Sequence, residues 1–104
     1  MAKIDFDYQR LDDTIHGRVR LSVMAYLSGA GEADFVELRT KVGGTDGNLL
    51  VHLRKLEEAG YIVSEKLKSH RSKPRTVTRL TASGRAAWLR YIRRLEQLID
   101  ASDR

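Results

Sequence analysis

The chain has 104 residues, of which 41% are hydrophobic, and a formal net charge of +5 at pH 7. A chain of this length can build one domain with one modest core, so a large ligand site would need a second subunit. It contains no cysteine, which excludes disulfides, thiolate metal sites and cysteine nucleophiles. We find no apolar run long enough to span a membrane and no secretory signal, and we therefore expect a cytoplasmic protein with no membrane partner.

The excess positive charge is concentrated in one part of the chain. Between residues 45 and 80 there are eight Lys and Arg residues against four acidic ones, whereas residues 1–31 hold four of each. A basic segment of this kind favours a polyanionic partner and indicates where that partner would bind.

Hydrophobic periodicity and turn signals divide the chain into a short series of elements. Apolar residues at helical spacing mark the helices, β-favouring residues mark the strands, and glycine pairs mark turns. The expected elements, all within one domain over 1–104, are an N-terminal arm or short helix over 1–16, helices over 17–29, 34–42 and 45–59, a β-hairpin over 61–80 and a long helix over 82–101. Because two helices flank Gly43 and Gly44, this order predicts a mainly α, α+β fold with a helix-turn-helix and a hairpin wing.

The helix over 45–59 is the centre of the prediction. Its spacing places Leu49, Leu53 and Leu56 on one face, which we expect to be core, and leaves the opposite face free for a partner. Thr45 is suited to cap the start of the helix, and Gly60 is suited to end it.

Two stretches carry a family resemblance. GGTDGNLLVHLRKLEEAGYI, residues 43–62, is followed by a basic hairpin and by RTVTRLTASGRAAWLRYI, residues 75–92. This arrangement resembles the winged-helix transcriptional regulators of the MarR and ArsR type over about residues 11–99. The resemblance implies a homodimer that binds operator DNA, with the 45–59 helix in the major groove and the hairpin as the wing.

Two departures limit what the resemblance implies. Many relatives carry small polar or basic residues where this chain has Leu50 and Val51, so base contacts at these positions do not follow from the family. The metal-sensing members use cysteine or clustered histidine ligands, which are missing here; His16, His52 and His70 fall in different elements. We therefore expect no metal site and no cofactor, and we expect His52 to be a packed, hydrogen-bonded histidine.

The outward face of the predicted reading helix supplies the candidate base contacts. Arg54 can make a two-pronged contact with guanine, and Val51 can pack on a thymine methyl group. Asn48 can either read adenine or form a local backbone hydrogen bond, and Gly47 either allows close approach to DNA or is a harmless first-turn glycine. The full candidate set on this helix is Thr45, Asp46, Gly47, Asn48, Leu50, Val51, Arg54 and Lys55.

The hairpin supplies a second candidate DNA contact. From residue 66 to residue 79 the chain is basic and contains no acidic residue, and a basic ribbon can follow phosphates or enter the minor groove. The alternative is that these charges belong to a solvated surface loop that contacts no DNA. The candidate wing residues are Lys66, Lys68, His70, Arg71, Ser72, Lys73 and Arg75.

The final helix carries an apolar seam that is long for a domain of this size. This seam either covers the core of its own subunit or forms a two-fold interface between subunits. We prefer the interface, because a small domain has little core to cover. The predicted dimer interface consists of Trp88, Tyr91, Ile92, Leu95, Leu98 and Ile99.

Together these features predict a sequence-specific double-stranded DNA-binding transcriptional regulator acting as a homodimeric repressor. The alternative is a winged-helix protein-interaction module in which Leu50 and Val51 form an apolar contact patch. We find no nucleophile–base pair, phosphate-binding loop or acidic metal cluster, so we do not expect an enzyme. A small-molecule effector would bind near Tyr26, Trp88 or Tyr91, although ordinary packing explains these aromatic residues equally well.

Overall fold

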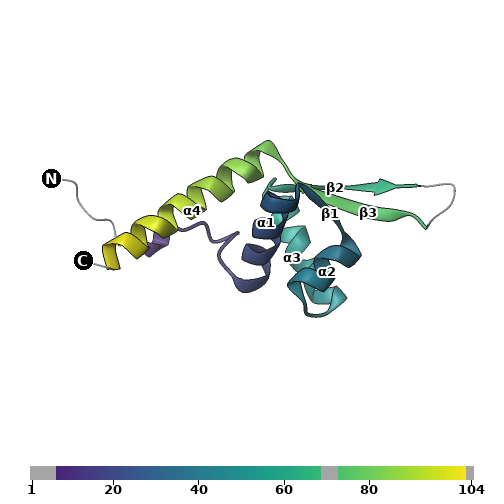
Figure 1. Cartoon of the computed structure of the whole chain (residues 1–104), viewed down its shortest axis with the longest axis horizontal. Helices are drawn as coiled ribbons and strands as arrows, with labels where there is room; N and C mark the ends of the chain where they lie inside the picture. The colour runs from purple at the N-terminus through teal and green to yellow at the C-terminus, as the bar shows by residue number, and fades with distance from the viewer. Residues whose placement is uncertain (1–6, 69–72, 103–104) are drawn as a thin grey trace.

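The computed structural model describes residues 7–68 and 73–102. Its elements in chain order are η1 (Tyr8–Arg10), α1 (Arg18–Ala30), β1 (Glu32–Asp34), α2 (Phe35–Val42), α3 (Asp46–Glu58), β2 (Ile62–Leu67), β3 (Arg75–Leu80) and α4 (Ala82–Ser102). Helices α1, α2 and α3 form a central body, from which the β2–β3 hairpin projects on one side and α4 on the other (Figure 1). The predicted mainly α winged helix-turn-helix with a long C-terminal helix is therefore confirmed.

The hairpin belongs to a three-stranded antiparallel sheet with strand order β1-β3-β2. Strand β2 pairs with β3 along its whole length, from Ile62 opposite Leu80 to Leu67 opposite Arg75. The short strand β1, which the sequence did not predict, pairs with the other edge of β3 and places Ala33 opposite Thr78. Strand β3 is thus the central strand, and its base is fixed from both sides.

The core lies between the inner faces of the first three helices and the base of the sheet. The leucines expected on the inner face of α3 are buried, with exposed fractions of 1% at Leu49, 7% at Leu53 and 0% at Leu56. Leu27 of α1 and Leu38 of α2 are also completely buried in the same cluster. Since full burial of a leucine is worth about 1.5–3 kcal/mol, these contacts hold the helix-turn-helix against α1.

The segment before α1 packs back on the rest of the chain, as expected of an arm; its first six residues lie outside the described part. Leu11 and Ile15 are buried in the core cluster. The Tyr61 hydroxyl donates a hydrogen bond to Asp12 at 2.5 Å, and a hydrogen bond of 2.7 Å joins His16 Nδ1 to the Tyr91 hydroxyl oxygen. The segment therefore connects the end of α3 with the first half of α4.

No helix within residues 7–68 and 73–102 combines the length and the apolar character needed to cross a bilayer.

Candidate nucleic-acid interface

The start of α3 has the geometry that the sequence predicts. Thr45 Oγ1 accepts a hydrogen bond from the Asn48 backbone N–H at 3.1 Å, which satisfies one of the free donors of the first turn. The preceding turn contains Gly43 and Gly44, whose φ angles of 85° and 86° lie in the left-handed region that favours glycine. This turn sets α3 against α2 in a helix-turn-helix.

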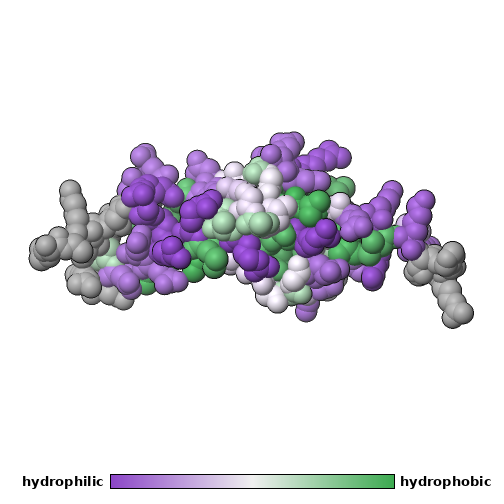
Figure 2. Space-filling model, turned by 90° about the horizontal axis from the view of Figure 1, so that it is seen from above, coloured by the Kyte–Doolittle hydropathy of each residue, from purple (hydrophilic) through white to green (hydrophobic). Residues whose placement is uncertain are grey.

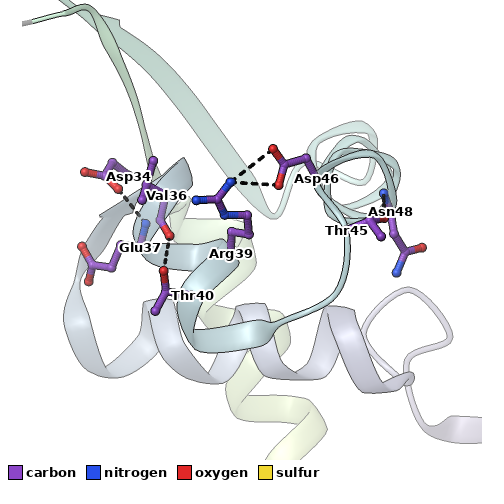
Figure 3. A network of polar contacts seen from close by, with 8 residues as sticks. All are labelled: Asp34, Val36, Glu37, Arg39, Thr40, Thr45, Asp46 and Asn48. Carbon is purple, nitrogen blue, oxygen red and sulfur yellow. Dashed lines mark hydrogen bonds and ion pairs between the residues drawn. The ribbon is translucent and has the colours of Figure 1, made fainter.

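The outer face of α3 is free of the core. Its centre is apolar, with exposed fractions of 44% at Leu50 and 50% at Val51. The Asn48 side chain makes no hydrogen bond with the described residues and points away from Asp46 (Figure 3), which leaves it available to a partner. The remaining candidate residues on this helix are also exposed, namely Thr45, Asp46, Gly47, Arg54 and Lys55.

One base at this face was not predicted from the sequence. Arg39 of α2 reaches across the turn, and its Nη1 atom lies 3.2 Å and 3.4 Å from the two carboxylate oxygens of Asp46 (Figure 3). Both side chains are largely solvent-exposed, at 43% for Arg39 and 56% for Asp46. The pair therefore places a base at the start of α3, in addition to Arg54 and Lys55 further along the helix.

Polar contacts also fix α2 in place. The backbone N–H of Glu37 donates to Asp34 Oδ1 at 2.8 Å, which confirms the predicted cap of this helix. The Tyr26 hydroxyl donates a hydrogen bond to the Glu37 carboxylate, and this bond, followed by burial, raises the pKa of Tyr26. Helix α1 is thereby joined to α2, and Tyr26 is engaged within the chain.

The wing presents bases along its described part. Lys66 and Lys68 on the β2 side and Lys73 and Arg75 on the β3 side are exposed, and none of them forms an ion pair with another described residue. Arg79, nearer the base of the hairpin, pairs with Glu65 at 3.4 Å across the two strands. The other candidate wing residues, His70, Arg71 and Ser72, lie outside the described part of the chain.

A groove of about 520 Å³ lies between the reading helix and the wing. Two hydroxyl groups line it, and Ser64 Oγ and Thr78 Oγ1 lie 2.9 Å apart. Arg54 of α3 and Arg75 of β3 also line it, together with the acidic residues Asp34 and Glu57. Its apolar lining consists of Phe35, Val36, Leu50, Leu53 and Pro74. The helix and the wing therefore share one concave surface, to which each contributes a base.

His52 lies on the inner flank of α3 and differs from the expectation of a hydrogen-bonded histidine. Its Nδ1 atom is buried without a partner among the described residues. Burial, and then the nearby charges of Arg20 and Lys55, lower the pKa of His52 below its usual value. In the described part of the chain, no group of three or more His, Asp or Glu residues is arranged to hold a metal ion.

The residues predicted for the dimer interface differ in how far they are buried within the single chain. Tyr91 is only 2% exposed within the single chain, where its ring stacks on Trp88 at a centroid distance of 5.9 Å, so it has almost no surface to offer a partner. Ile99 is 53% exposed. The rest, Trp88, Ile92, Leu95 and Leu98, are partly buried. Seen from above, apolar patches interrupt the mostly hydrophilic surface along α4 and again toward the wing (Figure 2).

The aromatic residues expected near an effector are accounted for by packing. Tyr26 is bonded to Glu37, and Tyr91 is buried and bonded to His16. Burial raises the pKa of Tyr91 above its usual value, so its hydroxyl stays protonated near neutral pH. Neither hydroxyl is free to orient a small molecule in this arrangement.

Known proteins resemble this chain in both sequence and fold. The profile of the winged helix DNA-binding domain matches residues 19–99. An uncharacterized protein of Methanocaldococcus jannaschii is 38% identical over 80 residues, which cover 77% of this chain and 86% of that protein. The transcriptional regulator homologue of Pyrococcus horikoshii is 32% identical, with a TM-score of 0.81 over 88% of this chain and 89% of that one.

A more distant likeness extends to the fold of MarR. A structure of Escherichia coli MarR with operator DNA is 21% identical and has a TM-score of 0.58, covering 80% of this chain and 64% of the MarR chain. With the helix-turn-helix and the wing, these likenesses are those of DNA-binding regulators and not of enzymes. The chain belongs to the winged helix DNA-binding domain family, is similar to a transcriptional regulator homologue and shares the fold of MarR.

Proposed function

We propose that this protein is a sequence-specific, homodimeric transcriptional repressor that binds double-stranded DNA. The observation that carries the proposal is the concave surface shared by α3 and the wing, which is lined by Arg54 from the helix and by the unpaired Arg75 from the wing. A helix of this size fits the major groove, and a basic ribbon beside it reaches the phosphates or the minor groove. The MarR structure with operator DNA supports the same use of this fold.

Base reading is assigned to the outer face of α3. Arg54 has the donors for guanine, and the free amide of Asn48 has the donor and acceptor that adenine requires. Leu50 and Val51 present methyl groups that suit thymine. Because this face has few charges, it contributes sequence preference and shape more than affinity.

Affinity is assigned mainly to the wing. Lys66, Lys68, Lys73 and Arg75 are exposed and have no acidic partner among the described residues, so their charges are available to phosphates. Phosphate contacts of this kind release counterions and make binding steeply dependent on salt.

The homodimer is assigned to the outward apolar face of α4. This helix extends away from the body (Figure 1) and leaves Ile99 about half exposed, beside partly buried Trp88, Ile92 and Leu95. A two-fold axis at this face would give two identical reading units, which matches the symmetry of palindromic operators.

Selection from a random pool of double-stranded DNA tests the proposal. We expect an inverted repeat whose half-sites lie about one helical turn apart, roughly 10 base pairs from centre to centre. An Arg54→Gln variant should lose the preference at one position of each half-site, whereas Arg93→Gln, an exposed position on α4, should select the same sequence. Failure of the wild-type protein to enrich any sequence would refute the proposed function.

The second candidate is a protein-interaction module, which the exposed aliphatic side chains favour. Val36 is 58% exposed and lines the same groove as Leu50. The two functions differ in their response to salt. Retention on heparin or random DNA that falls steeply with salt supports the repressor, whereas no retention at low salt supports the interaction module.

A further inference from the structure

The ion pair between Arg39 and Asp46 joins the two helices of the helix-turn-helix at the end of α3 that would enter the DNA. Arg39 Nη1 lies 3.2 Å from Asp46 Oδ1 and 3.4 Å from Oδ2, so the carboxylate faces the guanidinium with both oxygens (Figure 3). Asp46 is the first residue of α3. Any contact that this pair makes with DNA would fall at the front of the reading helix.

The Arg39–Asp46 ion pair contributes too little to the stability of the fold to account for its presence. Its side chains are 43% and 56% exposed, and an exposed ion pair contributes little to folding because water and salt screen it. An acid in the first turn of a helix is favourable by itself, since it faces the positive end of the helix dipole. Asp46 could serve that purpose without an arginine from a neighbouring helix.

Asp46 is poorly placed to read a base directly. An unpaired carboxylate at the entrance to the major groove would meet the negative potential of the phosphates, which disfavours its approach. With both oxygens turned toward Arg39, its acceptors are directed to the protein. Asp46 is one of the base contacts predicted from the sequence, but its geometry suits it better to hold the Arg39 guanidinium.

Arg39 retains most of its hydrogen-bonding capacity. A guanidinium carries five donors in a planar fork, and the Asp46 contacts use one of its three nitrogens, Nη1. Nε and Nη2 make no hydrogen bond with the described residues. A fork held by a carboxylate loses less freedom when it binds, and its planar geometry matches the O6 and N7 acceptors of guanine.

We infer that Arg39 is a base-reading residue for guanine and that Asp46 positions its guanidinium. This inference rests on the proposed function and adds to it a residue from outside α3. It assigns a guanine to each half-site at the position that faces the start of α3. In this arrangement Arg39 makes the base contact, and Asp46 acts only through Arg39.

The test uses the full chain in random-pool selection, followed by affinity measurements on the selected site and on its single base-pair variants. Arg39→Lys keeps the charge but loses the fork, and it should lower discrimination for one guanine per half-site by about 5- to 150-fold while the salt dependence is unchanged. Asp46→Asn should cause a smaller loss at the same guanine. When Arg39 is already lysine, Asp46→Asn should have no further effect there, because the two residues act as a unit.

Two control variants each remove one charge of the same sign from the same helix, away from the ion pair. Lys41→Gln on α2 and Glu58→Gln on α3 are exposed and should leave the guanine preference intact. Thermal unfolding of each variant separates loss of reading from loss of folding.

The inference is overturned if Arg39→Lys retains the preference at every guanine. It is also overturned if Arg39→Gln weakens binding equally for all sequences and reduces the salt slope, because that result describes a phosphate contact. Both outcomes leave the proposed function intact. Failure of the wild-type protein to select any sequence would instead refute the proposed function itself.

Discussion

The backbone oxygen of Tyr61 lies 1.9 Å from the position that a β-carbon on Gly84 would occupy. Tyr61 also binds the C-terminal turn of α3, since its N–H donates a hydrogen bond to the Leu56 carbonyl at 3.0 Å. The Tyr61 carbonyl in turn accepts a hydrogen bond from the Thr81 N–H at 3.0 Å, just before α4. The Tyr61 backbone therefore joins the end of α3 to the beginning of α4. Only a glycine at position 84 allows α4 to come this close to Tyr61.

Replacing Gly84 with alanine should destabilise the protein. The new methyl group would meet backbone atoms that cannot rotate away, and such overpacking costs about 1–3 kcal/mol. Gly29→Ala is the control, because nothing lies within 4 Å of a β-carbon at that helical position. That variant should gain about 0.5–1 kcal/mol. Urea unfolding of both proteins checks the prediction, and equal midpoints would contradict the close packing at Tyr61.

Stability should fall as the pH drops through the range in which His52 titrates. The pKa of His52 is lowered in the folded protein by burial and by Arg20 and Lys55, so the unfolded chain, with a histidine pKa of about 6.5, binds the proton more readily. The stabilising contribution is therefore complete above about pH 6.5 and is lost below it. Urea unfolding at about pH 7.5 and about pH 5.5 should show a larger loss for the wild type than for His52→Gln. Identical losses would exclude His52 as the cause.

Removing two wing charges should weaken binding to every DNA sequence by a similar factor. The double variant Lys66→Ala with Arg75→Ala removes two exposed bases that pair with no described acid. If both contact phosphates, the slope of log affinity against log salt should become shallower by about 1.8 per subunit. Arg85→Ala with Arg93→Ala removes the same charge from α4 and should leave the slope unchanged. An unaltered slope in the wing variant would show that these bases are only solvated.

A charge at the exposed end of the α4 seam should separate the dimer. Ile99 is 53% exposed in the single chain, so Ile99→Glu should fold normally but place an unpaired carboxylate in the proposed interface. We expect a rise of about tenfold or more in the dimer dissociation constant. Light scattering across a concentration series measures it, with the exposed Gln97→Glu as the control. A wild-type protein that has the monomer mass at all concentrations would end the dimer proposal.

Local sequence patterns predicted the helical part of the fold because each signal there lies within one element. The spacing of Leu49, Leu53 and Leu56 marks the buried face of α3, and the caps at Asp34 and Thr45 act on residues three positions away. Such signals depend on helical geometry alone, which the sequence carries directly.

Features that depend on distant contacts could not be predicted in the same way. Strand β1 is three residues long and has no β-favouring pattern; it exists because β3 offers it an edge. The position of Arg39 follows from how the turn sets α2 against α3, and Tyr91 is buried by the rest of the chain instead of by its own helix. The candidate site was therefore predicted for α3 and the wing, but not for the residue that α2 contributes.

The pairing of β1 with β3 affects what DNA binding requires of the protein. Because residues 32–34 fix the base of the central strand and continue directly into α2, the wing and the helix-turn-helix share one continuous frame. Because the helix and the wing are already fixed relative to each other, the protein loses little conformational entropy when it engages two DNA grooves at once. Substitutions in the short strand β1, remote from the reading face of α3, would then alter the angle between helix and wing and, with it, the DNA shapes that the protein accepts.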